Sequence, residues 1–231
     1  MAAALGWGAL AASSLVIGAL LSFARRWSKR QIGAVLAFGA GALISAVSFE
    51  LAEEGIAVGG AGVTGAGLGA GALTYFLLDR ELERRSQGEG GIGLALGAFL
   101  DGIPEQLVLG INLAAGQGVG VSLLVAIFVS NLPESMGSAE EMRKSGASRG
   151  KILRLWLAVA AICTLATVAG YLLADGASGD FKAAIDGFAA GALLVMLIDS
   201  MIPEAREDAG RSAGLVTVLG FALAAALSSL S

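Results

Sequence analysis

The sequence predicts an all-α polytopic membrane protein with eight transmembrane helices. The chain has 231 residues, of which 56% are hydrophobic and only 15% charged, and its mean hydropathy is +0.78. A soluble domain is about a quarter charged. Several apolar stretches reach the ~20 residues needed to cross a ~30 Å hydrocarbon core. Such stretches must be helical, because lipid offers no hydrogen bonds to the backbone.

Charged or glycine-rich breaks divide residues 1–231 into spans that make one transmembrane domain, with no room for a separate soluble domain. The first stretch has no basic segment before it and is followed by Arg25 and Arg26, which favours a retained helix over a cleaved signal peptide. The 35 glycines allow helices to approach closely in a membrane. The predicted spans are 4–24, 31–54, 56–79, 91–114, 119–142, 152–174, 182–205 and 212–230.

The positions of the basic residues predict the orientation. If the spans alternate, the loops after the first, third, fifth and seventh spans share one side of the membrane. These loops hold fourteen of the fifteen Lys and Arg residues, and only Lys182 lies opposite. The positive-inside rule makes the basic side cytoplasmic. We therefore expect a plasma (inner) membrane protein with both termini outside the cytoplasm.

Two internal similarities indicate a repeat. The segment 38–55 resembles 188–205 at an offset of 150 residues, so that Glu54 corresponds to Glu204. The predicted topology makes these copies antiparallel, as in inverted-repeat transporters; chance similarity between small-residue helices is the alternative. A second pair, FLDGIPE and FVSNLPE, aligns position for position on the fourth and fifth spans.

Every proline in the chain is followed by glutamate. A charge in mid-membrane costs at least ~2.5–3.5 kcal/mol, so such residues normally face a cavity and serve a pathway. Proline also removes a helical hydrogen bond and frees a carbonyl oxygen. A packing kink would explain one proline, but not a repeated proline beside a buried acid. The pairs are Pro104-Glu105, Pro133-Glu134 and Pro203-Glu204.

The spacing of polar residues around the first two pairs predicts a cation site. Asp101 and Glu105 are four residues apart, on one helix face and about 6 Å apart along the axis. The next span repeats this geometry. Converging carboxylates repel one another, so protons or a cation must neutralise them, and a divalent cation does this most efficiently. The candidate ligands are Asp101, Glu105, Ser130, Asn131 and Glu134, with Gln106 beside them.

Further acids mark the ends of a candidate pathway. Glu50 and Glu54 lie at the predicted outer end of the second span, and Asp199 and Glu204 lie toward the inner end of the seventh. Acids at the two mouths of a pathway would concentrate cations there. A solvated interfacial face is the alternative reading of such residues.

The strings DGIPEQ (101–106), SNLPES (130–135) and IDSMIPEA (198–205) resemble motifs of the ZIP (Zrt-/Irt-like) metal transporters. The resemblance implies eight spans in a 3+2+3 arrangement with inverted outer triplets. It also implies metal ligands on the fourth and fifth spans. The primary site would be lined by Asp101, Glu105, Ser130 and Glu134, and Asn131 with the two glutamates would shape an adjacent second site.

The chain departs from the family's usual motifs at three positions. Asp101 stands where histidine is usual, Gly102 where asparagine is usual, and Ser130 where histidine or glutamine is common; the chain has no histidine. An all-oxygen site suits Mg²⁺ or Mn²⁺ better than Zn²⁺, which favours nitrogen and sulfur ligands. The metal is expected as substrate, and its identity among Zn, Mn, Fe, Co, Cd and Mg is left open.

The leading hypothesis is inward transport of a divalent cation, and two other classes are weighed against it. A proton-coupled carrier of a non-metal solute would use the same carboxylates as proton relays. An intramembrane hydrolase or aspartyl protease is disfavoured, since only Asp101 lies at mid-depth, so no enzyme is expected. No phosphate-binding motif is present. The expected partners are membrane lipid and the metal ion, not nucleic acid, and a homodimer is left open.

Overall fold

The computed structural model describes residues 1–24, 27–86, 91–114 and 121–229, with the side chains at 83, 85–86, 91–101 and 122 outside the description. Every regular element in the described ranges is helical. The π-helical turns are labelled η. The elements are α1 (Ala2–Ala24), α2 (Lys29–Ala46), η1 (Val47–Glu53), α3 (Glu54–Ser86), α4 (Gly91–Ala114), α5 (Val121–Lys144), α6 (Arg149–Ala174), α7 (Gly179–Met196), η2 (Leu197–Met201), α8 (Ile202–Ala209) and α9 (Ser212–Ser228).

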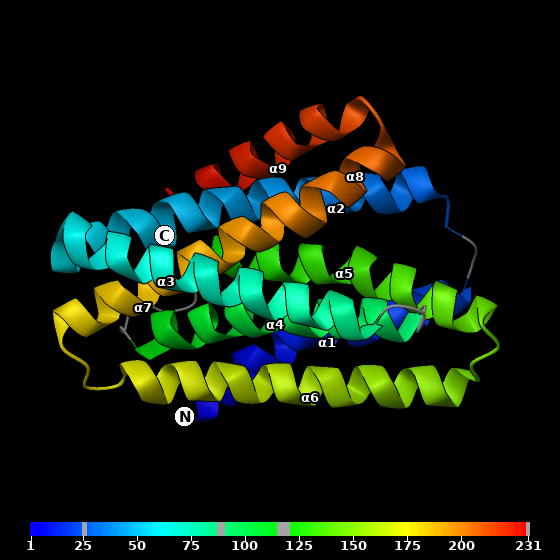
Figure 1. The fold of residues 1–231 in the computed structure, drawn as a ribbon, viewed down its shortest axis with the longest axis horizontal. Coiled ribbons are helices and arrows are strands. Elements are labelled where there is room, and N and C mark those ends of the chain that lie inside the picture. Colours follow the sequence, from blue (N-terminus) through cyan, green and yellow to red (C-terminus); the bar gives the residue numbers. More distant parts are fainter. Residues whose placement is uncertain (25–26, 87–90, 115–120, 230–231) are drawn as a thin grey trace.

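The described helices run back and forth along one axis, and both chain termini lie at the same end of the bundle (Figure 1). Four helical stretches of the described chain are long and apolar enough to cross a membrane, and α9 is a shorter apolar helix. One of the four contains two of the spans predicted from sequence. The four are Ala2–Ala24, Lys29–Leu82, Arg149–Ala174 and Gly179–Ala209.

The chain reverses direction inside α3, at Gly60, where φ is 80° and ψ is 161°. Glycine has no Cβ and therefore adopts this positive φ without strain. The break between spans was predicted at residues 54–56, which is too early, because the helix continues past Glu54 to this turn. We call this end of the bundle, which also holds both termini, the Gly60 end, and the opposite end, where α2 begins, the Lys29 end (Figure 1).

Two π-helical turns occupy matching places in the chain. η1 begins at Val47 and η2 at Leu197, 150 residues later, which is the offset of the repeated segments. A π turn is rare and is often found at functional sites. Pro203 lies in the first turn of α8, directly after η2, where proline is tolerated. Pro104 and Pro133, in contrast, lie inside α4 and α5.

Glycines allow three helix pairs to pack backbone against backbone. A Cβ at Gly191 of α7 would meet the backbone of Leu68 in α3, and one at Gly71 of α3 would meet Phe188 in α7. The same reciprocal contacts join α2 to α9 and α4 to α6. Small residues four apart permit such close approach in membranes. The small side chains that the sequence places on these helices therefore form interhelical contacts.

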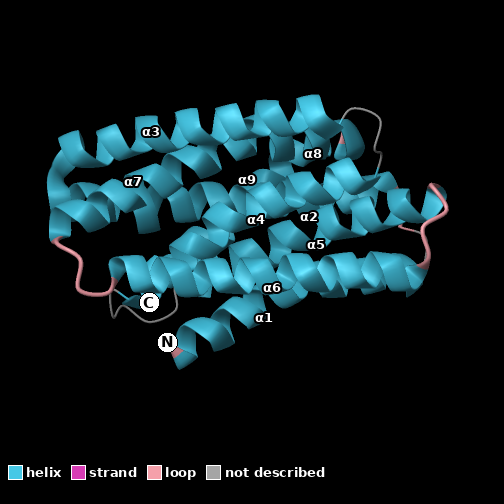
Figure 2. Ribbon diagram, turned by 60° about the horizontal axis from the view of Figure 1, so that its bottom comes forward, coloured by secondary structure: helices cyan, strands magenta, loops and turns pink. Residues whose placement is uncertain are grey.

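The central helices are α4 and α5, which contact each other and the helices of both halves of the chain. Figure 2 shows α3 and α7 on one side of the bundle and α6 with α1 on the other. The proline-containing segments of α4 and α5 therefore lie within the bundle.

Candidate functional site

The site centres on a buried contact between α4 and α5. Glu105 of α4 is only 1% exposed. Its Oε1 accepts a hydrogen bond from the Ser130 hydroxyl of α5 at 3.0 Å, and its Oε2 accepts one from the Asn131 side-chain amide at 3.2 Å. Both partners are themselves buried. Three of the five predicted ligands thus meet in one place.

Two oxygen atoms beside Glu105 retain capacity for a further partner. The Ser130 hydroxyl directs its single proton toward two acceptors at 3.0 Å, Glu105 Oε1 and the Ile127 carbonyl. The lone pairs of its own oxygen are therefore available to a cation. Asn131 donates through its amide nitrogen, and its buried Oδ1 has no hydrogen-bond partner. Amide, hydroxyl and carboxylate oxygens are the ligands that hard divalent cations prefer. The contact can therefore offer oxygen ligands to a cation.

Glu134 and Asp101 complete the predicted ligand set. Glu134 lies on α5, half-buried. The carboxylates of Glu105 and Glu134 both lie close enough to the buried thiol of Cys163 on α6 to disfavour its ionisation. Asp101 belongs to α4, but its side chain is outside the described residues. Within the described part of the chain, no three acidic or cysteine side chains stand close enough to hold an ion together.

Gln106 does not join the group around Glu105 and Ser130. Its side-chain oxygen accepts a short hydrogen bond of 2.5 Å from the Thr167 hydroxyl of α6, and its buried amide nitrogen has no partner. Gln106 is one residue further along α4 than Glu105, so its side chain points toward α6 instead of α5. Thr167 was not predicted, since a threonine in an apolar helix carries no sign of its partner.

Glycines hold the neighbouring helices against this site. Gly39 of α2 leaves no room for a side chain, because an added Cβ would lie 2.9 Å from the Ser130 Cα. Gly102 of α4 faces Cys163, whose sulfur lies 2.9 Å from the position of an added Cβ. Gly39 packs on Ser130, the partner of Glu105, and Gly102 precedes Glu105 by three residues on α4. The site is therefore positioned by α2 and α6 as well as by its own two helices.

At the Gly60 end, the structure adds an acid that sequence reasoning missed. Asp186 of α7 is 5% exposed, and its Oδ1 has no hydrogen-bond partner. It interacts electrostatically with Glu54 and Lys182. Glu50, in η1, is half-buried and interacts with Glu54. An acid inside a predicted span, four residues after a lysine, was the available signal for Asp186.

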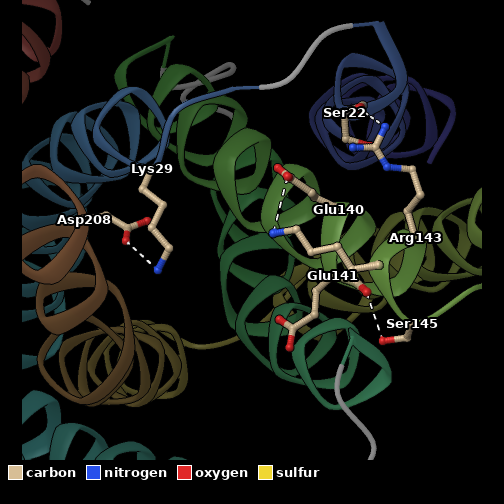
Figure 3. A network of polar contacts seen from close by, with 8 residues as sticks. Ser22, Lys29, Glu140, Glu141, Arg143, Ser145 and Asp208 are labelled. Carbon is tan, nitrogen blue, oxygen red and sulfur yellow. Dashed lines mark hydrogen bonds and ion pairs between the residues drawn. The ribbon is translucent and has the colours of Figure 1, made fainter.

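Toward the Lys29 end, one of the candidate pathway acids, Glu204, lies among charged residues of both signs. Asp199 and Glu204 are exposed, and Glu204 interacts electrostatically with Asp208, Lys29 and other charges. Figure 3 shows ion pairs and hydrogen bonds at this end of the bundle. Lys29 pairs with Asp208 at 3.5 Å, Lys144 pairs with Glu140 at 3.4 Å, and Arg143 donates to the Ser22 carbonyl at 3.4 Å.

The apolar helices and the buried polar contact between two proline-containing helices define an integral membrane protein of the polytopic helical class. The sequence profile described as "ZIP Zinc transporter" matches residues 77–228. That range covers more than half of the chain, and the protein belongs to the ZIP family.

Named relatives agree with this assignment. The chain is 31% identical over 218 residues to At3g08650 of Arabidopsis thaliana, which is named as a zinc transporter; the match covers 87% of this chain and 34% of that protein. It is 27% identical over 128 residues to the zinc transporter SLC39A7 of Mus musculus, covering 53% of this chain and 26% of the relative. The match to human SLC39A7 is 28% over 128 residues. The chain thus spans about a third of the first relative and about a quarter of SLC39A7.

Proposed function

We propose that this protein transports a divalent metal cation across its membrane through the site between α4 and α5. The observation that carries the proposal is the buried contact of Glu105 with Ser130 and Asn131. A charge-bearing group held at this depth is costly, and such groups normally line a transport pathway. Membership of the ZIP family and relatives named as zinc transporters support metal as the substrate.

The proposed ligand set extends beyond the Glu105 contact. Asp101, Glu105, Ser130 and Glu134 would bind the ion, and Asn131 with the two glutamates would shape an adjacent second site. The ion would enter past Glu50 and Glu54 and leave past Asp199 and Glu204, with Gln106 beside the path. The oxygen-rich donor set favours hard cations such as Mn²⁺ or Mg²⁺ over Zn²⁺.

The proposed architecture is eight spans in a 3+2+3 arrangement with inverted outer triplets. The two π turns at an offset of 150 residues support this repeat. Gly41 of α2 packs against α9 and Gly191, 150 residues later, packs against α3, as expected if α2 pairs with α9 as α7 pairs with α3. Alternating access would then be a rocking of the outer triplets against α4 and α5.

The proposed orientation places the Lys29 end in the cytoplasm and both termini outside. Described basic residues gather at that end of the bundle, among them Lys29, Lys144 and Arg206, and cytoplasmic loops are enriched in such residues. We further propose a plasma membrane location and inward movement of the cation down its electrochemical gradient.

Uptake of Mn²⁺, Zn²⁺, Fe²⁺, Co²⁺, Cd²⁺ and Mg²⁺ into proteoliposomes tests the proposal. The wild type is compared with the double variant Glu105→Ala, Glu134→Ala and with Glu140→Ala, a control whose carboxylate pairs with the exposed Lys144 at the Lys29 end. Flux that is lost only in the double variant supports the metal carrier. Full flux in the double variant would refute the site. No metal flux in folded wild type, together with pH-driven uptake of another solute, would favour the proton-coupled carrier.

A further inference from the structure

An apolar cavity of about 590 Å³ lies between α3, α4, α6 and α7, apart from the Glu105 contact. Small side chains create it: Ala66, Gly67 and Ala70 line it on α3, and Ala184 on α7. Pro104 and Leu107 form its wall on α4. The hydroxyl of Thr74, which also lines it, donates to the carbonyl of Ala70. The cavity therefore offers an apolar surface in the membrane-spanning part of the bundle.

The cavity opens at the lipid-facing surface of the helices. Three of its large lining residues are half exposed: Leu78 at 52%, Leu173 at 54% and Phe181 at 48%. Along α7 the lining runs from Phe181 to Ala192, a rise of about 17 Å at 1.5 Å per residue. One leaflet contributes about 15 Å, half of the ~30 Å hydrocarbon core. The length of the cavity thus matches one leaflet's acyl region.

The related helix pair of the bundle packs closely at the matching position. Gly39 brings α2 directly onto the backbone of Ser130 in α5. The residue 150 positions later is Ala189, whose side chain lines the cavity between α7 and α4. Ala189 thus carries a methyl group where its counterpart, Gly39, has no side chain. The backbones of α7 and α4 therefore cannot approach each other there as closely as those of α2 and α5 do.

Charged residues of both signs adjoin the Gly60 end of the cavity in the sequence. The last apolar lining residues at the Gly60 end are Leu173 and Phe181. Asp175 ends α6 two residues after Leu173, and Asp180 and Lys182 flank Phe181. Lys182 also interacts with Asp186. A headgroup that complements this pattern carries a phosphate for the lysine and an ammonium for the aspartates.

We propose that this cavity binds one acyl chain of a phosphatidylethanolamine molecule, whose headgroup contacts Lys182, Asp180 and Asp175. The bound chain fills the space between α7 and α4, the pair that must move if the outer triplets rock against the central helices. The proposal needs only insertion in a bilayer, and it holds whichever ion or solute the protein carries.

Photo-crosslinking tests it. Full-length protein in nanodiscs is irradiated with phosphatidylethanolamine that carries a diazirine in its acyl chain, and the labelled residues are mapped by mass spectrometry. We expect adducts on the cavity residues Tyr75 and Phe188. Ala70→Trp, at an exposed cavity position, should abolish them, whereas Ala169→Trp, at an exposed position of α6 outside the cavity, should not.

Headgroup recognition is tested separately. Lys182→Ala should lower cavity labelling by up to about fivefold, since an exposed ion pair contributes at most about 1 kcal/mol, whereas Lys151→Ala at the other end should leave it unchanged. Phosphatidylcholine and phosphatidylglycerol probes should label the cavity less. Labelling that is equal on α9 and the cavity, that is insensitive to Ala70→Trp, or that shows no headgroup preference would overturn the proposal.

Discussion

Glu105 of α4 and Ser130 of α5 are joined by a buried hydrogen bond of 3.0 Å, and Asn131 holds the other carboxylate oxygen. The bond links the two proline-containing helices at the centre of the bundle. Because both side chains are shielded from water, a change in the charge of Glu105 would disrupt this buried polar contact between the two helices.

Glu105→Gln should abolish metal transport while the protein still folds. The amide keeps the shape of the side chain and can still bond to Ser130, but it lacks the charge that binds a cation. We expect at least a tenfold weaker metal affinity, the lower end of what even a supporting group contributes to a metal site. Isothermal titration and vesicle uptake measure this loss. Glu140→Gln, in the pair with the exposed Lys144, should retain wild-type affinity.

Gly39→Ala should impair transport through a steric effect on Ser130. The added Cβ would lie 2.9 Å from the Ser130 Cα, so α2 or α5 must shift. Overpacking of this kind destabilises by about 1–3 kcal/mol. Thermal unfolding in detergent should show a lower Tm. Gly137→Ala on α5 is the matched control, since nothing lies within 4 Å of its added Cβ. An unchanged Tm and flux for Gly39→Ala would refute this packing role.

Gly102 and Cys163 should be energetically coupled. Gly102→Ala places a methyl group against the buried Cys163 sulfur, and Cys163→Ala removes that sulfur. The double variant should therefore be more stable than the sum of the single changes predicts. Neighbouring residues typically couple by about 0.5–3 kcal/mol. Unfolding free energies of the two single variants and the double variant complete the cycle, and additivity within error would contradict the contact.

Lys29→Ala should change stability very little. The Lys29 side chain is 80% exposed and pairs with Asp208 at 3.5 Å (Figure 3). Exposed ion pairs contribute about 0–1 kcal/mol, and salt screens them. Unfolding in low and high salt should show a loss within this range that disappears at high salt. A loss well above 1 kcal/mol would mean that Lys29 also neutralises Glu204 and its acidic neighbours in the folded state.

The candidate site was partly predictable from sequence. Proline followed by glutamate, at matching places in two adjacent apolar helices, pointed to Glu105, Ser130 and Asn131, and these three side chains do meet. Gln106 was placed with them but turns to Thr167 on α6 instead. Gln106 directly follows Glu105, and consecutive residues point about 100° apart around a helix. The sequence does not show which face of α4 contacts α5 and which contacts α6.

Two features near the candidate pathway needed the structure. The reversal at Gly60 was placed a few residues too early, because the run of glycines contains several positions that could turn. Asp186 was missed as a buried acid, since its burial depends on α3 packing against α7 through glycines far apart in the chain.

Three properties of this protein could be read from its amino-acid sequence alone: it lies in a membrane, its apolar segments are helical, and acids are placed within them. Hydropathy and backbone hydrogen bonding are properties of a segment and its solvent, so they can be read without partners. Which residues meet became visible only in the folded protein: Glu105 contacts Ser130, Gly39 packs on the same serine, and Gly102 packs on Cys163. Small residues on every helix face permit many packings, and the choice among them depends on contacts between segments distant in the chain.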